Sequence, residues 1–307
     1  MTVTKRYYDY SDYLKRRFPF KVQKISINAG FHCPNRDGTT GFDGCTYCNN
    51  LTFSPDYCRP TYNISVQLRE GIQFFARKYP EMKYLAYFQA YTNTYASLDT
   101  LKQKYEEALS FPDVVGLVIG TRPDCMPEDV LNYLAELAEN VYIQVEYGIE
   151  STSDITLKRI NRGHTFQQSV DAICRTSKRG IHVGAHLILG LPGEDRAQIL
   201  SHADLISTLP IDTLKLHHLQ IIRHTAMEQE FIAYPARFNL YSPLEYAALV
   251  VDFLERLNPH IAVERFISQS PRELLIAPDW GLKNHEFTAL IHKRFALRRT
   301  RQGKKFV

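Results

Sequence analysis

The chain of 307 residues contains no run of eighteen consecutive apolar residues, so no membrane-spanning helix is expected. Its first twenty residues have no apolar stretch of the kind found in secretory signal peptides. Repeated units and low-complexity segments are also missing. These absences predict a cytoplasmic protein, in a compartment that keeps thiols reduced. The length suits one large α/β domain, with or without a smaller appended one.

The charge of the chain is mild overall but unevenly distributed. The net charge is +4, yet residues 293–307 contain seven lysines and arginines and no acidic residue. A basic tail of this kind can bind a phosphate backbone, and it can equally be a solvated end of the last helix. A second basic run, at residues 5–17, is interleaved with tyrosines, which suits base stacking as well as ordinary packing.

Three of the six cysteines fall within residues 33–48. Eleven residues separate Cys33 from Cys45, and two separate Cys45 from Cys48. Three thiolates can bind three irons of a [4Fe–4S] cluster and leave the fourth iron open for another ligand. A zinc site and a thioredoxin-like redox pair at Cys45 and Cys48 remain alternatives, although no histidine lies between Cys33 and Cys48 to complete a zinc site.

Segments of strand and helix character alternate between residues 22 and 225. Six apolar runs predict strands, and five amphipathic segments between them predict helices. The strands are expected at residues 22–30, 83–91, 113–124, 141–151, 182–195 and 212–225, and the helices at 63–79, 98–110, 127–140, 165–180 and 196–210. Such βαβ units predict an α/β protein with a parallel sheet. It would be a partial (β/α)6 TIM-type barrel or, alternatively, a doubly wound sheet.

Three regions are expected along the chain. Residues 1–20 form an N-terminal helical arm, with Ser11 or Asp12 as its cap. Residues 21–225 form the partial barrel, which includes the cysteine loop. Residues 226–307 form a small C-terminal α+β extension that ends in the basic tail. The elements expected in the extension are a helix at 242–257, a short strand at 261–269, and a turn and helix within 274–295.

Polar and glycine residues follow the predicted strands where each one ends. Ligands bind at the carboxyl ends of the strands in both kinds of α/β sheet, so these residues are candidates for a binding site. They are Gln89, Thr121–Asp124, Glu146, Glu150, Gly190–Glu194, His217, His218 and Gln220. His217 and His218 point to opposite faces of one strand, so at most one of them is expected at the mouth of the barrel.

Several short motifs in a fixed order resemble a known family. The three cysteines, with Tyr47 inside the segment C-T-Y-C and followed by this order of strands, resemble the radical S-adenosylmethionine (SAM) enzymes. The segments TRPDC, VEYGIES, NRGH, LILGLPGED and APDW are similar to those of a bacterial subgroup related to the radical SAM domain of the elongator catalytic subunit, which modifies wobble uridines of tRNA. The eleven-residue gap departs from the superfamily's commonest C-x3-C-x2-C spacing, but it resembles the longer gap of elongator relatives.

The resemblance implies two cofactors and a reaction. A [4Fe–4S] cluster held by Cys33, Cys45 and Cys48 would bind SAM through its open iron. An electron from a donor such as flavodoxin or ferredoxin would cleave SAM and give a 5′-deoxyadenosyl radical, which abstracts a hydrogen atom from the substrate. The implied substrate is tRNA, at the C5 side chain of a wobble uridine, with a carboxymethylaminomethyl type as one candidate. The alternatives are a small-molecule or protein substrate, and a non-catalytic RNA-binding metalloprotein.

The resemblance also implies which residues contact SAM. Tyr47 would lie near the adenine, and Glu150 and Arg162 would reach the ribose and the methionine carboxylate. The implied SAM-binding residues are Tyr47, Gln89, Arg122, Glu146, Glu150, Arg162, His186 and Gly190. An ion pair with a core arginine is the alternative for Glu146 and Glu150, and a helix cap is the alternative for Arg162. The other cysteines are expected to be structural, because too few remain for a second cluster. These are Cys58, Cys125 and Cys174.

Overall fold

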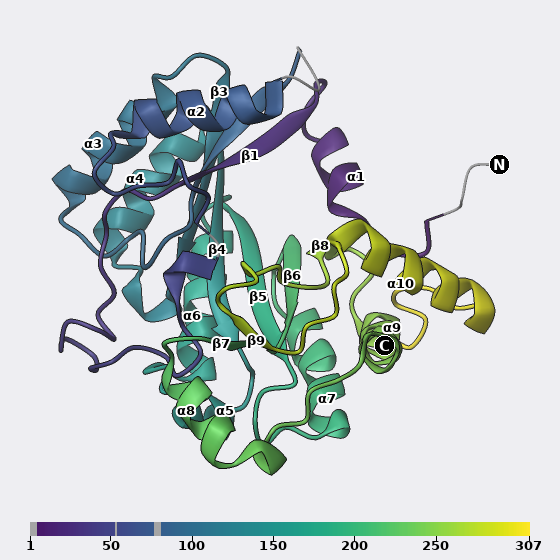
Figure 1. Ribbon diagram of the computed structural model, residues 1–307. Helices are drawn as coiled ribbons and strands as arrows, with labels where there is room; N and C mark the ends of the chain where they lie inside the picture. The colour runs from purple at the N-terminus through teal and green to yellow at the C-terminus, as the bar shows by residue number, and fades with distance from the viewer. Residues whose placement is uncertain (1–4, 53, 77–80) are drawn as a thin grey trace.

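The computed structural model describes residues 5–52, 54–76 and 81–307. Its parallel strands form one curled sheet, with helices around the outer side (Figure 1). In spatial order the strands are β1 (Val22–Ile27), β2 (Lys83–Phe88), β3 (Val114–Thr121), β4 (Tyr142–Glu150), β5 (His182–Leu189), β6 (Thr213–His218) and β8 (Ala262–Arg265). The strand order follows the sequence without reversal, whereas a doubly wound sheet reverses its order. The predicted α/β partial barrel is therefore confirmed.

Helices connect successive strands and cover the outer face of the sheet (Figure 1). They are α2 (Ile64–Ala76), α3 (Leu98–Leu109), α4 (Glu128–Ala138), α6 (Phe166–Ser177), α7 (Arg196–Ser207) and α9 (Pro243–Arg256), with α10 (Asn284–Arg298) packed on α9. Ser242 caps α9 by accepting the Glu245 N–H, and Pro243 occupies the first turn, as the sequence predicted. None of the described helices is long and apolar enough to cross a membrane.

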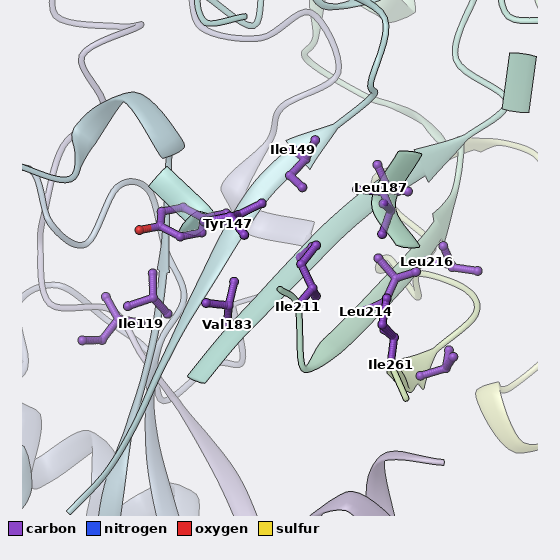
Figure 2. Packing of buried hydrophobic residues seen from close by; sticks show 14 of the residues in the cluster. Ile119, Tyr147, Ile149, Val183, Leu187, Ile211, Leu214, Leu216 and Ile261 are labelled. Carbon is purple, nitrogen blue, oxygen red and sulfur yellow. The ribbon is translucent and has the colours of Figure 1, made fainter. Parts of the chain in front are cut away.

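The two faces of the sheet differ in polarity. Successive residues of a strand point to opposite faces. Tyr147, Val183 and Leu214 belong to the hydrophobic cluster shown in Figure 2, which lies between the sheet and its helices. Their neighbours Glu146 and Lys215 point to the inner face, where their side chains meet at 2.6 Å. The inner face of the partial barrel is therefore the polar one.

The main sheet contains one more strand than the sequence predicted. The short strand expected at 261–269 is β8, and it pairs with β6 at the edge of the main sheet. Ala262 donates its backbone N–H to the Asp212 carbonyl at 2.9 Å, and both Ala262 and Val263 are buried. This pairing joins segments about fifty residues apart in the sequence, so local patterns did not reveal it.

A second, smaller sheet lies beyond the strand ends. β7 (Ile221–Ile222) pairs antiparallel with β9 (Leu275–Ala277), so the strand predicted at 212–225 is divided into β6 and β7. Two helices that were not predicted, α5 (Asp154–Arg159) and α8 (Ala226–Ala233), contribute to a hydrophobic cluster beside this sheet. Short 3₁₀ helices occur at Asn50–Thr52, Pro123–Cys125 and Pro235–Arg237.

The N-terminal helical segment is shorter than expected. Helix α1 covers only Tyr10–Lys15, and residues 1–4 lie outside the described residues. Its cap is Asp9, which accepts the Ser11 N–H at 2.8 Å, so the prediction of Ser11 or Asp12 as cap was wrong. Asp9, Ser11 and Asp12 all have side chains that can cap a helix, so the sequence alone did not distinguish the residue that does so.

The basic tail packs against the rest of the protein. Gln302 is buried, and its Oε1 accepts the backbone N–H of Tyr8 at 2.8 Å. Arg298 forms ion pairs with Asp252 and Glu255 of α9, and Lys305 pairs with Glu255. Part of the tail's charge is therefore neutralised within the fold, while other cations of the tail remain exposed.

Candidate active site

A cavity opens at the carboxyl ends of the strands, on the polar inner face of the sheet. Its walls come from the cysteine loop, from β2 to β6, and from residues 265–270. The predicted residues that line it are Cys33, Cys45, Cys48, Tyr47, Gln89, Arg122, Glu146, Glu150, Arg162 and His186. Gly190 is not among the described lining residues, because it faces Tyr241, whose ring would lie 3.3 Å from a Cβ at this position.

The three loop cysteines border this cavity as free thiols. Nitrogen donors surround two of them. Asn35 Nδ2 lies 3.7 Å from Cys45 Sγ, and Asn50 Nδ2 lies 3.7 Å from Cys48 Sγ. Hydrogen bonds to cysteine sulfurs are a recurrent feature of iron–sulfur sites, where they tune the reduction potential. The donors around the thiols therefore fit a [4Fe–4S] cluster.

Burial disfavours the thiolate form of Cys48, which is the form that binds a metal. Burial raises the pKa of the Cys48 thiol to about 11, and the neighbouring Cys45 raises it further, against the opposing effect of Arg36. A bound metal ion offsets such a cost, because it deprotonates the thiols that coordinate it. Within the described residues, no three His, Cys, Asp or Glu side chains converge on a single ion.

The NRGH motif holds the cysteine loop in place. Asn161 Nδ2 donates to the Gly44 carbonyl at 2.7 Å, and Asn35 Nδ2 donates to the Asn161 carbonyl at 2.6 Å. The backbone N–H of Thr46 donates to the Ile160 carbonyl at 3.0 Å. Asn161 adopts φ +52°, a left-handed conformation that asparagine tolerates better than most residues. The motif thus closes around the loop, a role that the sequence did not reveal.

Arg162 connects the cysteine loop to strand β4. Its Nη1 lies 3.5 Å from Cys45 Sγ, its Nη2 donates to the Gly148 carbonyl at 2.7 Å, and Glu150 Oε1 lies 3.8 Å away. A Cβ at Gly148 would lie 2.8 Å from Nη2, so a larger residue there would displace the guanidinium from its present position. Glu150 has φ +69°, a strained backbone of the kind that clusters at functional sites. The structure therefore brings Glu150 and Arg162 together, as the resemblance implied.

Glu146 is an ion-pair partner on the floor of the cavity. Its oxygens lie 2.6 Å from Lys24 Nζ, 2.6 Å from Lys215 Nζ and 3.1 Å from His186 Nε2. Burial opposes ionisation, but the two ammonium groups outweigh it and hold the pKa of Glu146 well below its usual range. Burial lowers the pKa of Lys215 to about 8, although Glu146 opposes the shift. The structure thus favours the ion-pair alternative for Glu146, with lysines in place of the expected arginine, and His186 takes part in the same cluster.

Arg122 and Gln89 are also held by neighbours. The guanidinium of Arg122 donates to both oxygens of Asp124, at 3.0 and 2.7 Å, and to the Arg162 carbonyl at 2.9 Å. Gln89 Oε1 accepts from Ser26 Oγ at 3.1 Å. Both residues line the cavity, but Arg122 supports the NRGH motif rather than presenting a free charge.

The two histidines at the end of β6 are both among the residues that line the cavity, but their rings have different neighbours. The ring centroid of His217, on the inner face, lies 5.5 Å from that of His186. The ring of His218 stacks on Trp280 at 4.1 Å and lies 5.7 Å from that of Tyr246 on α9. The two rings thus point to different faces, in agreement with the expectation of at most one histidine at the mouth.

Comparison with known proteins agrees with this geometry. Residues 29–206, more than half of the chain, match the Radical SAM superfamily, and residues 211–296 match the Radical_SAM C-terminal domain. The chain belongs to the radical SAM superfamily. Radical SAM enzymes use a [4Fe–4S] cluster and SAM, and these are the cofactors of this protein.

Individual relatives of this radical SAM protein cover different parts of it. YtqA of Bacillus subtilis (strain 168) is 37% identical over 302 residues, which are 98% of this chain and 93% of YtqA. The tRNA uridine(34) acetyltransferase of Dehalococcoides mccartyi is 26% identical over 173 residues, 55% of this chain and 36% of that protein. The structure of Methanocaldococcus infernus Elp3 superposes with a TM-score of 0.69 at 17% identity, covering 92% of this chain and 64% of Elp3, which shows a shared fold.

The cysteines outside the loop of this radical SAM protein lie in ordinary packing positions. Cys58 is buried and donates to the Ser26 carbonyl at 3.0 Å, and burial raises the pKa of its thiol to about 12. Burial likewise raises the pKa of Cys125 to about 12. Cys174 is half-buried on α6. None of the three is among the described residues that line the cavity.

Proposed function

We propose that this radical SAM enzyme acts on tRNA, at the C5 side chain of the wobble uridine. Support comes from the relative in D. mccartyi, whose name refers to uridine 34 of tRNA, and from the fold shared with an archaeal Elp3. These relatives support the choice of substrate, and the family supports the radical chemistry.

The observation that carries the proposal is an aromatic side chain at the lip of the cavity. Tyr91 lines the cavity and is 41% exposed, so its ring is available to a nucleobase. Its backbone has φ +63°, and its N–H donates to Asn50 Oδ1 at 3.2 Å, so the cysteine loop helps to hold it. A base that reaches such a cavity must leave its stack, and stacking on an aromatic ring offsets part of that cost.

Different residues of the cavity have different roles in the proposed reaction. When bound, the reduced cluster supplies one electron, which splits SAM into methionine and a 5′-deoxyadenosyl radical. Cys33, Cys45 and Cys48 would hold the cluster. Glu150 and Arg162 would orient the ribose and methionine parts of SAM. Tyr47 packs beside the apolar cluster of β7 and α8, where it would cover the adenine and exclude water.

Nucleoside mass spectrometry of tRNA from a deletion strain tests the substrate. We expect the modified wobble uridine to disappear and its precursor to accumulate. Complementation with the wild-type gene should restore it, and complementation with Cys45→Ala should not. An unchanged wobble-uridine profile would overturn the tRNA proposal and favour a small-molecule or protein substrate. Restoration by Cys45→Ala would favour a non-catalytic RNA-binding metalloprotein.

We also propose a cytoplasmic location and an electron donor of the flavodoxin or ferredoxin type. Both follow from the proposed chemistry, because the reaction consumes a low-potential electron and the substrate is tRNA. Reduced flavodoxin or ferredoxin should support SAM cleavage by the purified, reconstituted enzyme. No turnover with either protein, together with turnover under dithionite, would exclude them as donors.

A further inference from the structure

Strand β8, at the edge of the sheet opposite β1, contributes an arginine to the cavity. Arg265 is half-buried, and its Nε is buried with no hydrogen-bond partner. Its Nη2 lies 3.3 Å from His217 Nε2. Among the described residues, no carboxylate forms an ion pair with Arg265, whereas the other cavity arginines on the strand side, Arg122 and Arg162, each lie beside one.

The charges on the inner face do not balance around this arginine. Within the described part of the chain, the cluster that includes Lys24, Lys215 and Arg265 contains only two carboxylates, Glu146 and Glu264. A buried charge without a partner is costly, so such a group is normally paired by a ligand if not by the protein. The cluster therefore has one positive charge more than its carboxylates can neutralise, and Arg265 is the unpaired cation.

The histidine beside Arg265 orients it and adds no negative charge. Burial and the adjacent Arg265 hold the pKa of His217 well below its usual value, so the ring is neutral. Because Nε2 faces the guanidinium, Nε2 accepts, and the Nδ1–H donates to Ser268 Oγ, with which it is in contact. The hydroxyl proton of Ser268 is then available for a ligand oxygen.

Two neutral side chains with donors also line the cavity. They are Gln220 and Ser270. Ser270 Oγ donates to Gln220 Oε1 at 2.8 Å, which leaves the amide N–H groups of Gln220 as donors. A planar guanidinium fork flanked by hydroxyl and amide donors matches the two oxygens of a carboxylate.

We propose that Arg265, with Gln220 and Ser268, binds a carboxylate of the substrate and so selects substrates with an acidic side chain. This inference rests on the proposed function for its setting, where the acidic group would be a C5 substituent of the wobble uridine. Under the proposed function, Arg162 and not Arg265 would orient the carboxylate of SAM. One excess positive charge matches the single negative charge of a carboxylate.

The test compares two nucleosides on the reconstituted enzyme with SAM bound. One is 5-carboxymethylaminomethyluridine, and the other is 5-aminomethyluridine, which lacks the carboxylate. We expect the wild-type enzyme to bind the acidic nucleoside about tenfold to a hundredfold more tightly, as charge-assisted hydrogen bonds allow. Arg265→Gln should abolish this preference, and Arg265→Lys should retain part of it. Arg272→Gln, which changes an exposed arginine nearby, is the matched control.

Three results would overturn the carboxylate site. They are no preference for the acidic nucleoside in the wild-type enzyme, a preference retained in Arg265→Gln, and an equal loss of SAM affinity in that variant. The last result would assign Arg265 to SAM. If the deletion strain has unchanged tRNA while the Arg265-dependent preference persists, the tRNA proposal fails and the carboxylate site stands. If the deletion strain has altered wobble uridine but the enzyme shows no Arg265-dependent preference, the carboxylate site fails and the tRNA proposal stands.

Discussion

Arg162 joins the sulfur of Cys45 to strand β4, with its Nη1 3.5 Å from Cys45 Sγ and its Nη2 2.7 Å from the Gly148 carbonyl. One guanidinium therefore touches a proposed cluster ligand and is also bound to the sheet. Donors to cysteine sulfur stabilise the reduced form of an iron–sulfur cluster, so this contact links the fold to the electron-transfer step.

Replacing this arginine with lysine separates charge from geometry. Arg162→Lys keeps a positive charge but cannot donate to Cys45 and Gly148 together. We expect iron content near that of the wild type, a more negative cluster potential, and SAM cleavage slower by about tenfold. Redox titration followed by electron paramagnetic resonance measures the potential. Arg159→Lys, at a surface ion pair with Glu230, should change none of these. An unchanged potential would remove Arg162 from the cluster environment.

The loop cysteines differ from the remaining ones in a way that iron analysis can measure. Cys45→Ala removes one of the three proposed ligands, so we expect the roughly four irons of the anaerobically reconstituted protein, its broad absorbance and SAM cleavage to be lost. Cys174→Ala alters a half-buried thiol on α6, outside the cavity lining, and should retain all three. Persistent SAM cleavage in Cys45→Ala would contradict the ligand assignment.

Asn161 should govern how firmly the loop retains its cluster. Its side chain donates to the Gly44 carbonyl at 2.7 Å, and its backbone has φ +52°. Asn161→Gly keeps the backbone conformation accessible and loses the hydrogen bond, whereas Asn161→Ala also strains the backbone. We expect faster iron loss to a chelator in both variants, by about threefold to tenfold in the glycine variant, consistent with about one hydrogen bond. Equal retention in wild type and Asn161→Gly would show that the bond is dispensable.

Stability at low pH should report the buried ion pairs of Glu146. Burial opposes ionisation, but Lys215 and Lys24 hold its pKa well below the usual 4.5. A carboxylate of this kind contributes stability above its unfolded pKa and loses it as the pH falls toward the folded pKa. Glu146→Gln should cost about 3–5 kcal/mol near neutral pH, because it leaves buried ammonium groups unpaired.

Urea unfolding across pH measures this contribution. The difference in free energy of unfolding between wild type and Glu146→Gln should stay constant from about pH 7 to about pH 5. It should shrink as the pH falls below the usual 4.5 toward the lower folded pKa. Glu139→Gln, at an exposed position of the same chain, should follow the wild type throughout. A difference that is already lost above about pH 5 would mean that the Glu146 carboxylate is not held ionised by the lysines.

The sequence predicted the parts of the site that depend on local spacing. The cysteine loop, the alternation of strands and helices, and the adjacency of Glu150 and Arg162 were all accessible from motifs. The partnership of Glu146 with Lys215 was not, because it joins inner-face residues of β4 and β6 that are 69 residues apart. Each residue lies in an apolar run that predicts a strand. Such a run does not show which residue of another strand will lie beside it on the inner face.

The role of Arg265 was inaccessible for a similar reason. It depends on β8, a four-residue strand that the sequence placed in a separate extension. Only pairing with β6 brings Arg265 to the cavity. The SAM contact implied for the backbone of Gly190 stays a prediction, because the contact of this position with Tyr241 concerns its side-chain direction alone. Motifs therefore predicted residues within a short stretch, but not residues that reach the cavity through long-range strand pairing.

The basic tail should divide into structural and tRNA-binding cations. Arg298 is engaged by Asp252 and Glu255, whereas Arg301 and Lys304 are exposed and hold no ion pair within the described residues. Phosphate contacts release counterions, so each lost contact flattens the salt dependence of binding. The double variant Arg301→Gln, Lys304→Gln should bind tRNA more weakly, with a salt slope reduced by about one to two, and should unfold like the wild type.

Arg298→Gln is the control for the double variant, because Arg298 forms ion pairs within the fold. It should lower the free energy of unfolding by about 1 kcal/mol and leave the salt slope of tRNA binding unchanged, because its partners are carboxylates of α9. Filter binding at several salt concentrations, with urea unfolding of the same proteins, separates the two effects. A normal salt slope in the double variant would show that tRNA binds another surface of the protein. In that case we expect the cavity lip to provide most of the tRNA affinity, and Tyr91→Ala should remove it.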